Sequence, residues 1–116
     1  MRVSKNKLNP ILKKEVVNTF IQAIDDLKGA SEVETFLNSF FNEAELETYA
    51  KRLAISYWLK KGRSYENIKN NLKVSSATIA TVEKVMDTPG FKLALKKIEA
   101  EEWANVWSEK IKKIIK

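Results

Sequence analysis

Residues 63–86 constrain the fold of this chain more than any other stretch, because they predict two short helices joined by a tight turn. The first predicted helix runs from a cap at Ser64 to Leu72, and the second follows a cap at Ser75 or Ser76. Five apolar side chains have the spacing that closes the small core of a helix-turn-helix: Ile68, Leu72, Val74, Ile79 and Val82.

The second of these helices has a surface suited to the major groove of DNA. Small and polar residues separate its apolar ones, and they present hydroxyl and methyl groups to base edges without steric conflict. Cations near the motif are placed to hold phosphates rather than to contact bases. The candidate DNA-binding residues are Arg63, Lys69, Lys73, Ser75, Ser76, Thr78, Thr81 and Lys84. Short helix pairs occur in any helical domain, so the alternative is a helical protein-interaction or dimerisation module with a degenerate helix-turn-helix.

Composition favours a nucleic-acid partner and argues against several other classes. The chain has 21 Lys plus Arg against 15 Asp plus Glu, a net charge of +6 that suits a phosphate-binding surface. It has no cysteine, no histidine and only three glycines, so it lacks thiolate metal ligands, the commonest general base and a phosphate-binding loop. We therefore expect no enzyme activity, no catalytic residue, no metal and no cofactor. No membrane-length apolar run or signal-peptide core is present, which predicts a cytoplasmic protein.

The segment before the motif predicts three helices. Asn9 caps the first helix, Pro10 opens it and Gly29 ends it. Its apolar stripe is too wide for one neighbour, which predicts a dimer interface. The third helix stops at Gly62. Capping boxes, in which a polar cap precedes a glutamate by three positions, start the second and third helices: Ser31 with Glu34, and Asn42 with Glu45.

The segment after the motif predicts one long helix. Thr88 and Pro89 start it, and it extends to about Ile115. Trp103 and Trp107 lie on one face of it, and such a pair indicates core or a dimer seam rather than a cofactor site. Because no segment alternates with a period of two, the fold class is all-α, with about six helices.

The order of these elements, together with three motifs, resembles the Trp repressor family, and its YerC/YecD-like branch in particular. The motifs are Trp58-Leu-Lys-Lys-Gly62, Ser64-x-x-x-Ile68-Lys-Asn-x-Leu72 and Ser75-x-Ala-Thr-Ile79. The resemblance implies an interleaved homodimer that binds double-stranded DNA at palindromic operators, with one recognition helix per half-site, as a repressor-like transcriptional regulator. The expected organisation is a single domain, 1–116, with a dimerisation helix in 1–29, a Trp-repressor-like core in 30–86 holding the helix-turn-helix in 64–86, and a C-terminal helical extension in 87–116.

Three positions bear on how closely the chain follows that family. Lys73 stands where members usually have glycine, and a positive φ at lysine costs about 1 kcal/mol. Arg52 matches an arginine that helps to bind the amino acid in Trp repressors, although a solvated helix arginine is the alternative. Thr81 stands where relatives place the partner arginine, so a cation for the ligand is lost. We therefore expect L-tryptophan not to act as a corepressor.

Overall fold

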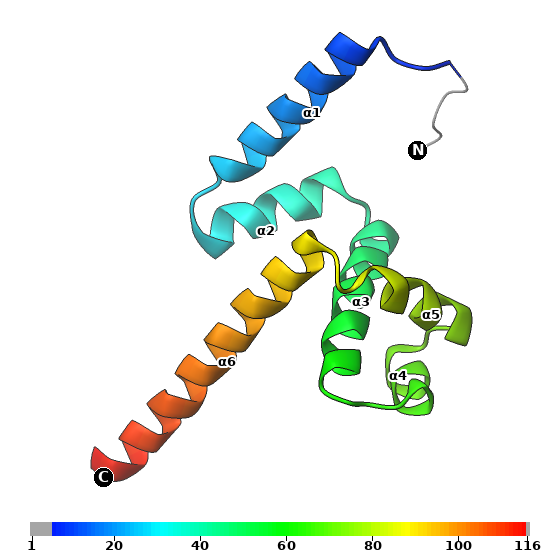
Figure 1. Ribbon diagram of the computed structural model, residues 1–116. Coiled ribbons are helices and arrows are strands. Elements are labelled where there is room, and N and C mark those ends of the chain that lie inside the picture. The colour runs from blue at the N-terminus through cyan, green and yellow to red at the C-terminus, as the bar shows by residue number, and fades with distance from the viewer. Residues whose placement is uncertain (1–5, 116) are drawn as a thin grey trace. The chain divides into compact units, whose positions relative to one another are not determined.

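Six helices and no strand make up the part of the chain that the computed structural model describes, residues 6–115 (Figure 1). The helices are α1 Pro10–Asp25, α2 Gly29–Phe40, α3 Glu43–Lys60, α4 Tyr65–Leu72, α5 Ser76–Val85 and α6 Pro89–Ile115. The all-helical class, the number of helices and the long C-terminal helix are thus confirmed. The side chains of Trp103 and Trp107, for which we predicted a core or seam role, lie outside the described residues.

The chain divides into two compact units, with the division between Leu46 and Glu47. The first unit holds α1, α2 and the first turn of α3, and the second holds the rest of α3 with α4, α5 and α6. The domain boundaries expected from the sequence stay predictions.

Helix α1 starts as predicted but ends earlier. The side chain of Asn9 accepts hydrogen bonds from the N–H groups of Ile11 at 2.9 Å and Leu12 at 3.3 Å, and proline occupies the first turn. The helix ends at Asp25 rather than at Gly29. Gly29 has a φ of +72° and opens the next helix instead, because it lets the chain change direction between the two.

The capping box predicted at Ser31 and Glu34 is wrong. Helix α2 begins two residues earlier, at Gly29, and its cap residue Lys28 makes no side-chain cap hydrogen bond. The neighbouring carboxylate, Glu32, reaches back instead and accepts a hydrogen bond from the N–H of Lys28 at 2.9 Å. A glutamate in the first turn satisfies a free N–H group there, so the helix does not need a serine cap.

Four phenylalanines join α1 to α2 and the residue after it. The ring of Phe20 stacks on that of Phe40 with centroids 5.4 Å apart, and Phe40 stacks on Phe36 at 5.0 Å. Phe41 meets Phe40 edge to face at 5.2 Å. These contacts cover only one side of α1, since no residue of that helix is buried.

Helix α3 has the start and the stop that the sequence predicts. The side chain of Asn42 accepts a hydrogen bond from the N–H of Glu45 at 2.8 Å. The carboxylate of Glu45 accepts one from the N–H of Asn42 at 3.0 Å, which confirms the capping box. At the other end Gly62 adopts a φ of +83°. The N–H of Arg63 then donates to the carbonyl of Trp58 at 3.1 Å, which closes the last turn and directs the chain into α4.

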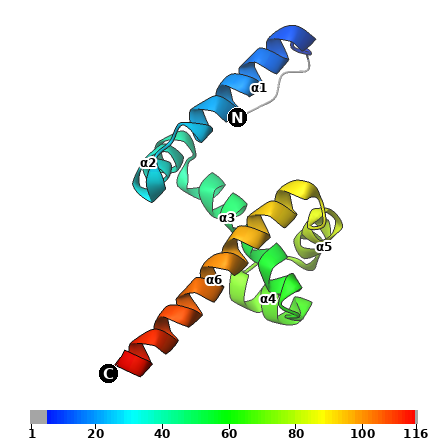
Figure 2. The same ribbon diagram turned by 60° about the vertical axis from the view of Figure 1, so that its left-hand side comes forward.

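The core of the second unit is formed by α3, α4 and α5. Ile68 and Ile79 are fully buried and Val82 is 3% exposed, with Leu72 and Val74 packed against them, so the predicted helix-turn-helix core is confirmed. Figure 2 shows α6 running across α3, and α6 adds the buried Leu95. The centre of the core also holds Ile55 of α3, which the sequence analysis did not include.

Candidate nucleic-acid interface

The turn between α4 and α5 has the geometry of a helix-turn-helix. Ser64 caps α4 by accepting from the N–H of Asn67, and Ser75 caps α5 by accepting from the N–H of Thr78, both at 3.1 Å. Between the helices Lys73 has φ 56° and ψ 53°, the left-handed conformation expected at the position that relatives fill with glycine. The motif therefore keeps its backbone although the side chain differs.

A polar contact joins the two helices on the solvent side. The hydroxyl of Tyr65 in α4 donates to Oε1 of Glu83 in α5 at 2.6 Å. This hydrogen bond raises the pKa of Tyr65, and desolvation and the negative charge of Glu83 add to the effect. The raised pKa favours the neutral, donating phenol, and its hydrogen bond to Glu83 adds a link between α4 and α5 on the solvent side.

The outward face of α5 is small and carries one cation. Ile79 and Val82 define the buried side, so at 100° per residue Ala77 and Lys84 lie opposite to them. Ala77, Lys84 and the neighbouring Ser76 are all exposed. Within the described part of the chain the hydroxyl of Ser76 has no hydrogen-bond partner, so it is available to a ligand.

The other hydroxyls predicted to contact DNA are engaged within the motif. Ser75 and Thr78 share a hydrogen bond of 2.9 Å between their hydroxyl oxygens, and the hydroxyl of Thr81 donates to the carbonyl of Ala77 at 2.9 Å. At 100° per residue Ser75 and Thr78 lie toward the buried side of α5, whereas Thr81 lies near the outward face. Among the described residues, Ser76 is thus the hydroxyl of the predicted set that forms no hydrogen bond within the motif.

The predicted cations lie at different places around the motif. The guanidinium of Arg63 lies 4.0 Å from the centroid of the Trp58 ring and donates to Asn67 at 3.3 Å, so it is held at the start of α4. Lys69 is exposed on α4 and Lys84 is exposed on α5, whereas Lys73 is in the turn. The four cations surround the helix-turn-helix and do not form one cluster.

A cavity of about 410 Å³ separates α3 from the turn and from α5. It combines hydroxyl groups, three cations and an apolar floor, a combination that suits a small anionic or zwitterionic molecule. Its lining residues are Thr48, Lys51, Arg52, Ile55, Lys73, Val74, Ser75, Thr78, Thr81 and Val82.

Arg52 is therefore part of a cavity wall as well as an exposed helix residue. Its guanidinium also lies 5.6 Å from the ring centroid of Tyr49. Sequence reasoning missed Thr48 and Lys51 beside it. The spacing of Thr48, Arg52 and Ile55 at intervals of four and three residues was the available signal, because such residues share one face of a helix.

Fold and motif together define a helix-turn-helix protein of the DNA-binding regulator class. The chain belongs to the Trp repressor family: the profile described as "Trp repressor protein" matches residues 15–99. That match extends the resemblance seen in the sequence into α1 on one side and α6 on the other.

One solved structure supports the same assignment. The chain is similar to a TrpR-like protein from Eubacterium eligens, with 25% identity and a TM-score of 0.70 over 78% of this chain and 96% of that one. No curated protein matches the chain. Among the described residues, no helix has the length and apolar character needed to cross a membrane.

Proposed function

We propose that this protein is a sequence-specific double-stranded DNA-binding transcriptional regulator, repressor-like, that acts as a homodimer through α4 and α5. The observation that carries the proposal is the closed helix-turn-helix with a small, exposed outward face on α5, in a chain of the Trp repressor family. A cytoplasmic location, a regulatory rather than enzymatic role and membership of the YerC/YecD-like branch complete the proposal.

The homodimer is supported by the surface of α1. Ile11 is 73% exposed and Ile21 57% exposed, and a stripe of such side chains facing water is costly. A second copy of the chain covers it at little cost because the same stripe is available on both partners. The exposed apolar residues of α1 are Ile11, Leu12, Val16, Val17, Phe20, Ile21 and Ile24.

The DNA contacts follow from the positions around the motif. We assign Ser76 to base edges, and Arg63, Lys69, Lys73 and Lys84 to phosphates. Ser75, Thr78 and Thr81 bond within the motif, so we assign them to water-mediated contacts or to the orientation of α5.

The test is a titration of duplex DNA at two salt concentrations. Lysines and arginines that face phosphates release counterions, so affinity should fall steeply as salt rises. Ser76→Ala should change the ranking of sequences by about 1–3 kcal/mol per disturbed base pair. Lys69→Ala should weaken all sequences alike and reduce the salt slope by about 0.9. Undetectable binding at low salt, or identical behaviour of the two variants, would contradict this assignment.

A second candidate is a helical interaction module with a degenerate helix-turn-helix. It is favoured by the hydroxyls of Ser75, Thr78 and Thr81, which form hydrogen bonds within the motif. The DNA titration separates the two, since an interaction module keeps its fold and assembly but shows no salt-dependent binding to duplex.

Arg52 remains the proposed ligand contact in the cavity between α3 and α5. We propose that L-tryptophan is not its ligand, because Thr81 supplies no second cation for the carboxylate or the indole face. Loss of one charge-assisted contact, about 1.5–3 kcal/mol, weakens binding roughly ten- to a hundredfold. Calorimetry with L-tryptophan should show no saturable heat, and DNA affinity should not change in its presence. Saturable binding that strengthens DNA affinity would mean that Lys51 or Lys73 replaces the missing arginine.

A further inference from the structure

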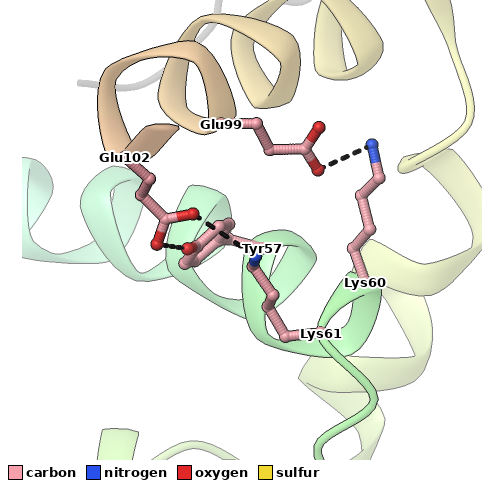
Figure 3. Close-up of polar contacts among 5 residues, drawn as sticks. All are labelled: Tyr57, Lys60, Lys61, Glu99 and Glu102. Carbon is pink, nitrogen blue, oxygen red and sulfur yellow. Dashed lines mark hydrogen bonds and ion pairs between the residues drawn. The ribbon is translucent and has the colours of Figure 1, made fainter. Parts of the chain in front are cut away.

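Two ion pairs join α6 to the end of α3, directly before the helix-turn-helix (Figure 3). Nζ of Lys60 lies 3.0 Å from Oε1 of Glu99, and Nζ of Lys61 lies 3.3 Å from Oε2 of Glu102. The two lysines are consecutive and each is matched by a carboxylate from the facing helix. The pairing therefore offsets the positive charges of Lys60, which ends α3, and of Lys61, which follows it.

A third contact holds the carboxylate of Glu102 in place beside Lys61. The hydroxyl of Tyr57 donates to Oε1 of Glu102, so this carboxylate uses one oxygen for Tyr57 and the other for Lys61. The ammonium of Lys61 also lies 5.4 Å from the centroid of the Tyr57 ring. Lys61 directly follows α3, and its N–H donates to the carbonyl of Tyr57 at 3.0 Å, so the two residues, four apart, share one face. Glu102 thus sits in a small site that holds it against Lys61.

The pairs are accessible and weak enough to exchange. The side chains of Lys60 and Lys61 are 47% and 48% exposed, and those of Glu99 and Glu102 are 38% and 46% exposed. Surface pairs of this kind contribute about 0–1 kcal/mol, so they do little to hold the fold together. A DNA phosphate that came near the lysines would compete with the carboxylates on similar terms.

We infer that Glu99 and Glu102 form an autoinhibitory contact that masks Lys60 and Lys61 and lowers the affinity of the protein for DNA. Arg63, a proposed phosphate contact at the start of α4, follows these lysines within three residues of the chain. The inference rests on the proposed DNA-binding function. Glu99 is the last residue of the family match and Glu102 lies beyond it, so the contact with Lys61 comes from outside the matched region. Movement or neutralisation of that part of α6 would release the two cations to phosphates.

The test compares glutamines at adjacent positions of the full chain, with random-sequence duplex DNA as the probe. Glu102→Gln frees Lys61, so affinity should rise and the slope of log affinity against log salt should steepen by about 0.9. Glu101→Gln changes the net charge equally, but Glu101 forms no ion pair among the described residues, so its slope should stay at the wild-type value. The double variant Glu99→Gln, Glu102→Gln should steepen the slope by about 1.8.

Two further variants separate masking from a merely structural role. Adding Lys60→Gln and Lys61→Gln to the double variant should abolish the gain, because the cations that bind the phosphates are then absent. Tyr57→Phe removes the second anchor of Glu102 with no change of charge, and it should raise affinity in the same direction but less than Glu102→Gln.

The outcomes distinguish this inference from the proposed function. If wild-type protein binds DNA but Glu102→Gln and Glu101→Gln have equal slopes, the inference is overturned and the proposed function stands. A gain that survives the loss of both lysines overturns it as well. If neither wild type nor any variant binds duplex at low salt, the proposed function fails and the masking fails with it.

Discussion

Helices α1 and α5 are both amphipathic, yet they bury their apolar residues to opposite extents. None of the 16 residues of α1 is buried, whereas α5 buries Ile79 and Val82 among its ten. Ile79 is completely enclosed by α3 and α4, while Ile21 at the middle of α1 is 57% exposed. The comparison shows that the apolar side of α5 is enclosed by its own chain, whereas the apolar side of α1 is exposed.

The difference assigns different roles to the two helices. A helix whose apolar side is enclosed has its outer face free for another kind of molecule, as the exposed Ser76 and Lys84 of α5 illustrate. A helix whose apolar side is open needs a partner for that side, and the proposed second copy supplies it. Each of the following experiments alters one side of this comparison.

Removal of α1 should have the largest effect. Deleting residues 1–29 exposes Phe36 and Phe40 of α2, which lose the ring of Phe20, and it removes the proposed dimer surface. Obligate dimers often have no stable monomer, so the truncated chain should aggregate or unfold. Sedimentation and circular dichroism test this, with the full chain as control. A well-folded monomer would show that α1 is an independent appendage.

Substitution inside the enclosed core should have the second-largest effect. Ile79→Ala leaves a cavity among fully buried side chains and should lower the free energy of unfolding by about 2–5 kcal/mol. Ile21→Ala is the matched control on the open helix, and it should instead shift the monomer–dimer equilibrium. Urea unfolding and sedimentation are measured on both variants. Equal losses of stability without any change in assembly would mean that the two helices are buried alike in solution.

The same contrast explains which features could be predicted from the sequence. Caps and turns depend on a few neighbouring residues, so Asn9, Asn42 and Ser64 all cap where predicted. Ser31 does not, because Glu32 and a glycine with positive φ start α2 earlier than the motif implied.

Contacts between distant segments could not be predicted in the same way. Ile55 sits at the centre of the core because α4, α5 and α3 converge on it, a condition that the periodicity of α3 alone does not reveal. The cavity beside Arg52 likewise depends on how α3 and α5 pack. The pairing of Lys61 with Glu102 joins residues 41 positions apart, and no local pattern specifies it.

A substitution in the turn of the helix-turn-helix should have a smaller effect on stability, and it should stabilise the fold rather than destabilise it. Lys73 holds a φ of 56°, which costs a non-glycine residue energy, so Lys73→Gly should raise the free energy of unfolding by about 1 kcal/mol. The measurement is urea unfolding. Lys69→Gly is a suitable control, because it places the same residue inside α4, where it should destabilise by a similar amount. A loss of stability in Lys73→Gly would mean that the lysine side chain contributes more than its backbone strain costs.

The smallest effect should come from the solvent-side link between Tyr65 and Glu83. The pKa of Tyr65 is raised in the folded state, since the neutral phenol donates to Glu83 and the phenolate is repelled by it. A raised folded pKa means that the stabilisation is fully present below the ordinary tyrosine value of about 10 and is lost as the pH rises through the folded value. Tyr65→Phe lacks this group, so its stability should be lower than that of wild type near neutrality, and the difference should shrink above about pH 10. Thermal unfolding of both proteins across that range tests the sign, and the difference cancels the titration of the lysines that the two proteins share. A difference that stays constant with pH would show that Tyr65 contributes through its ring packing against the core and not through the hydrogen bond that joins α4 to α5.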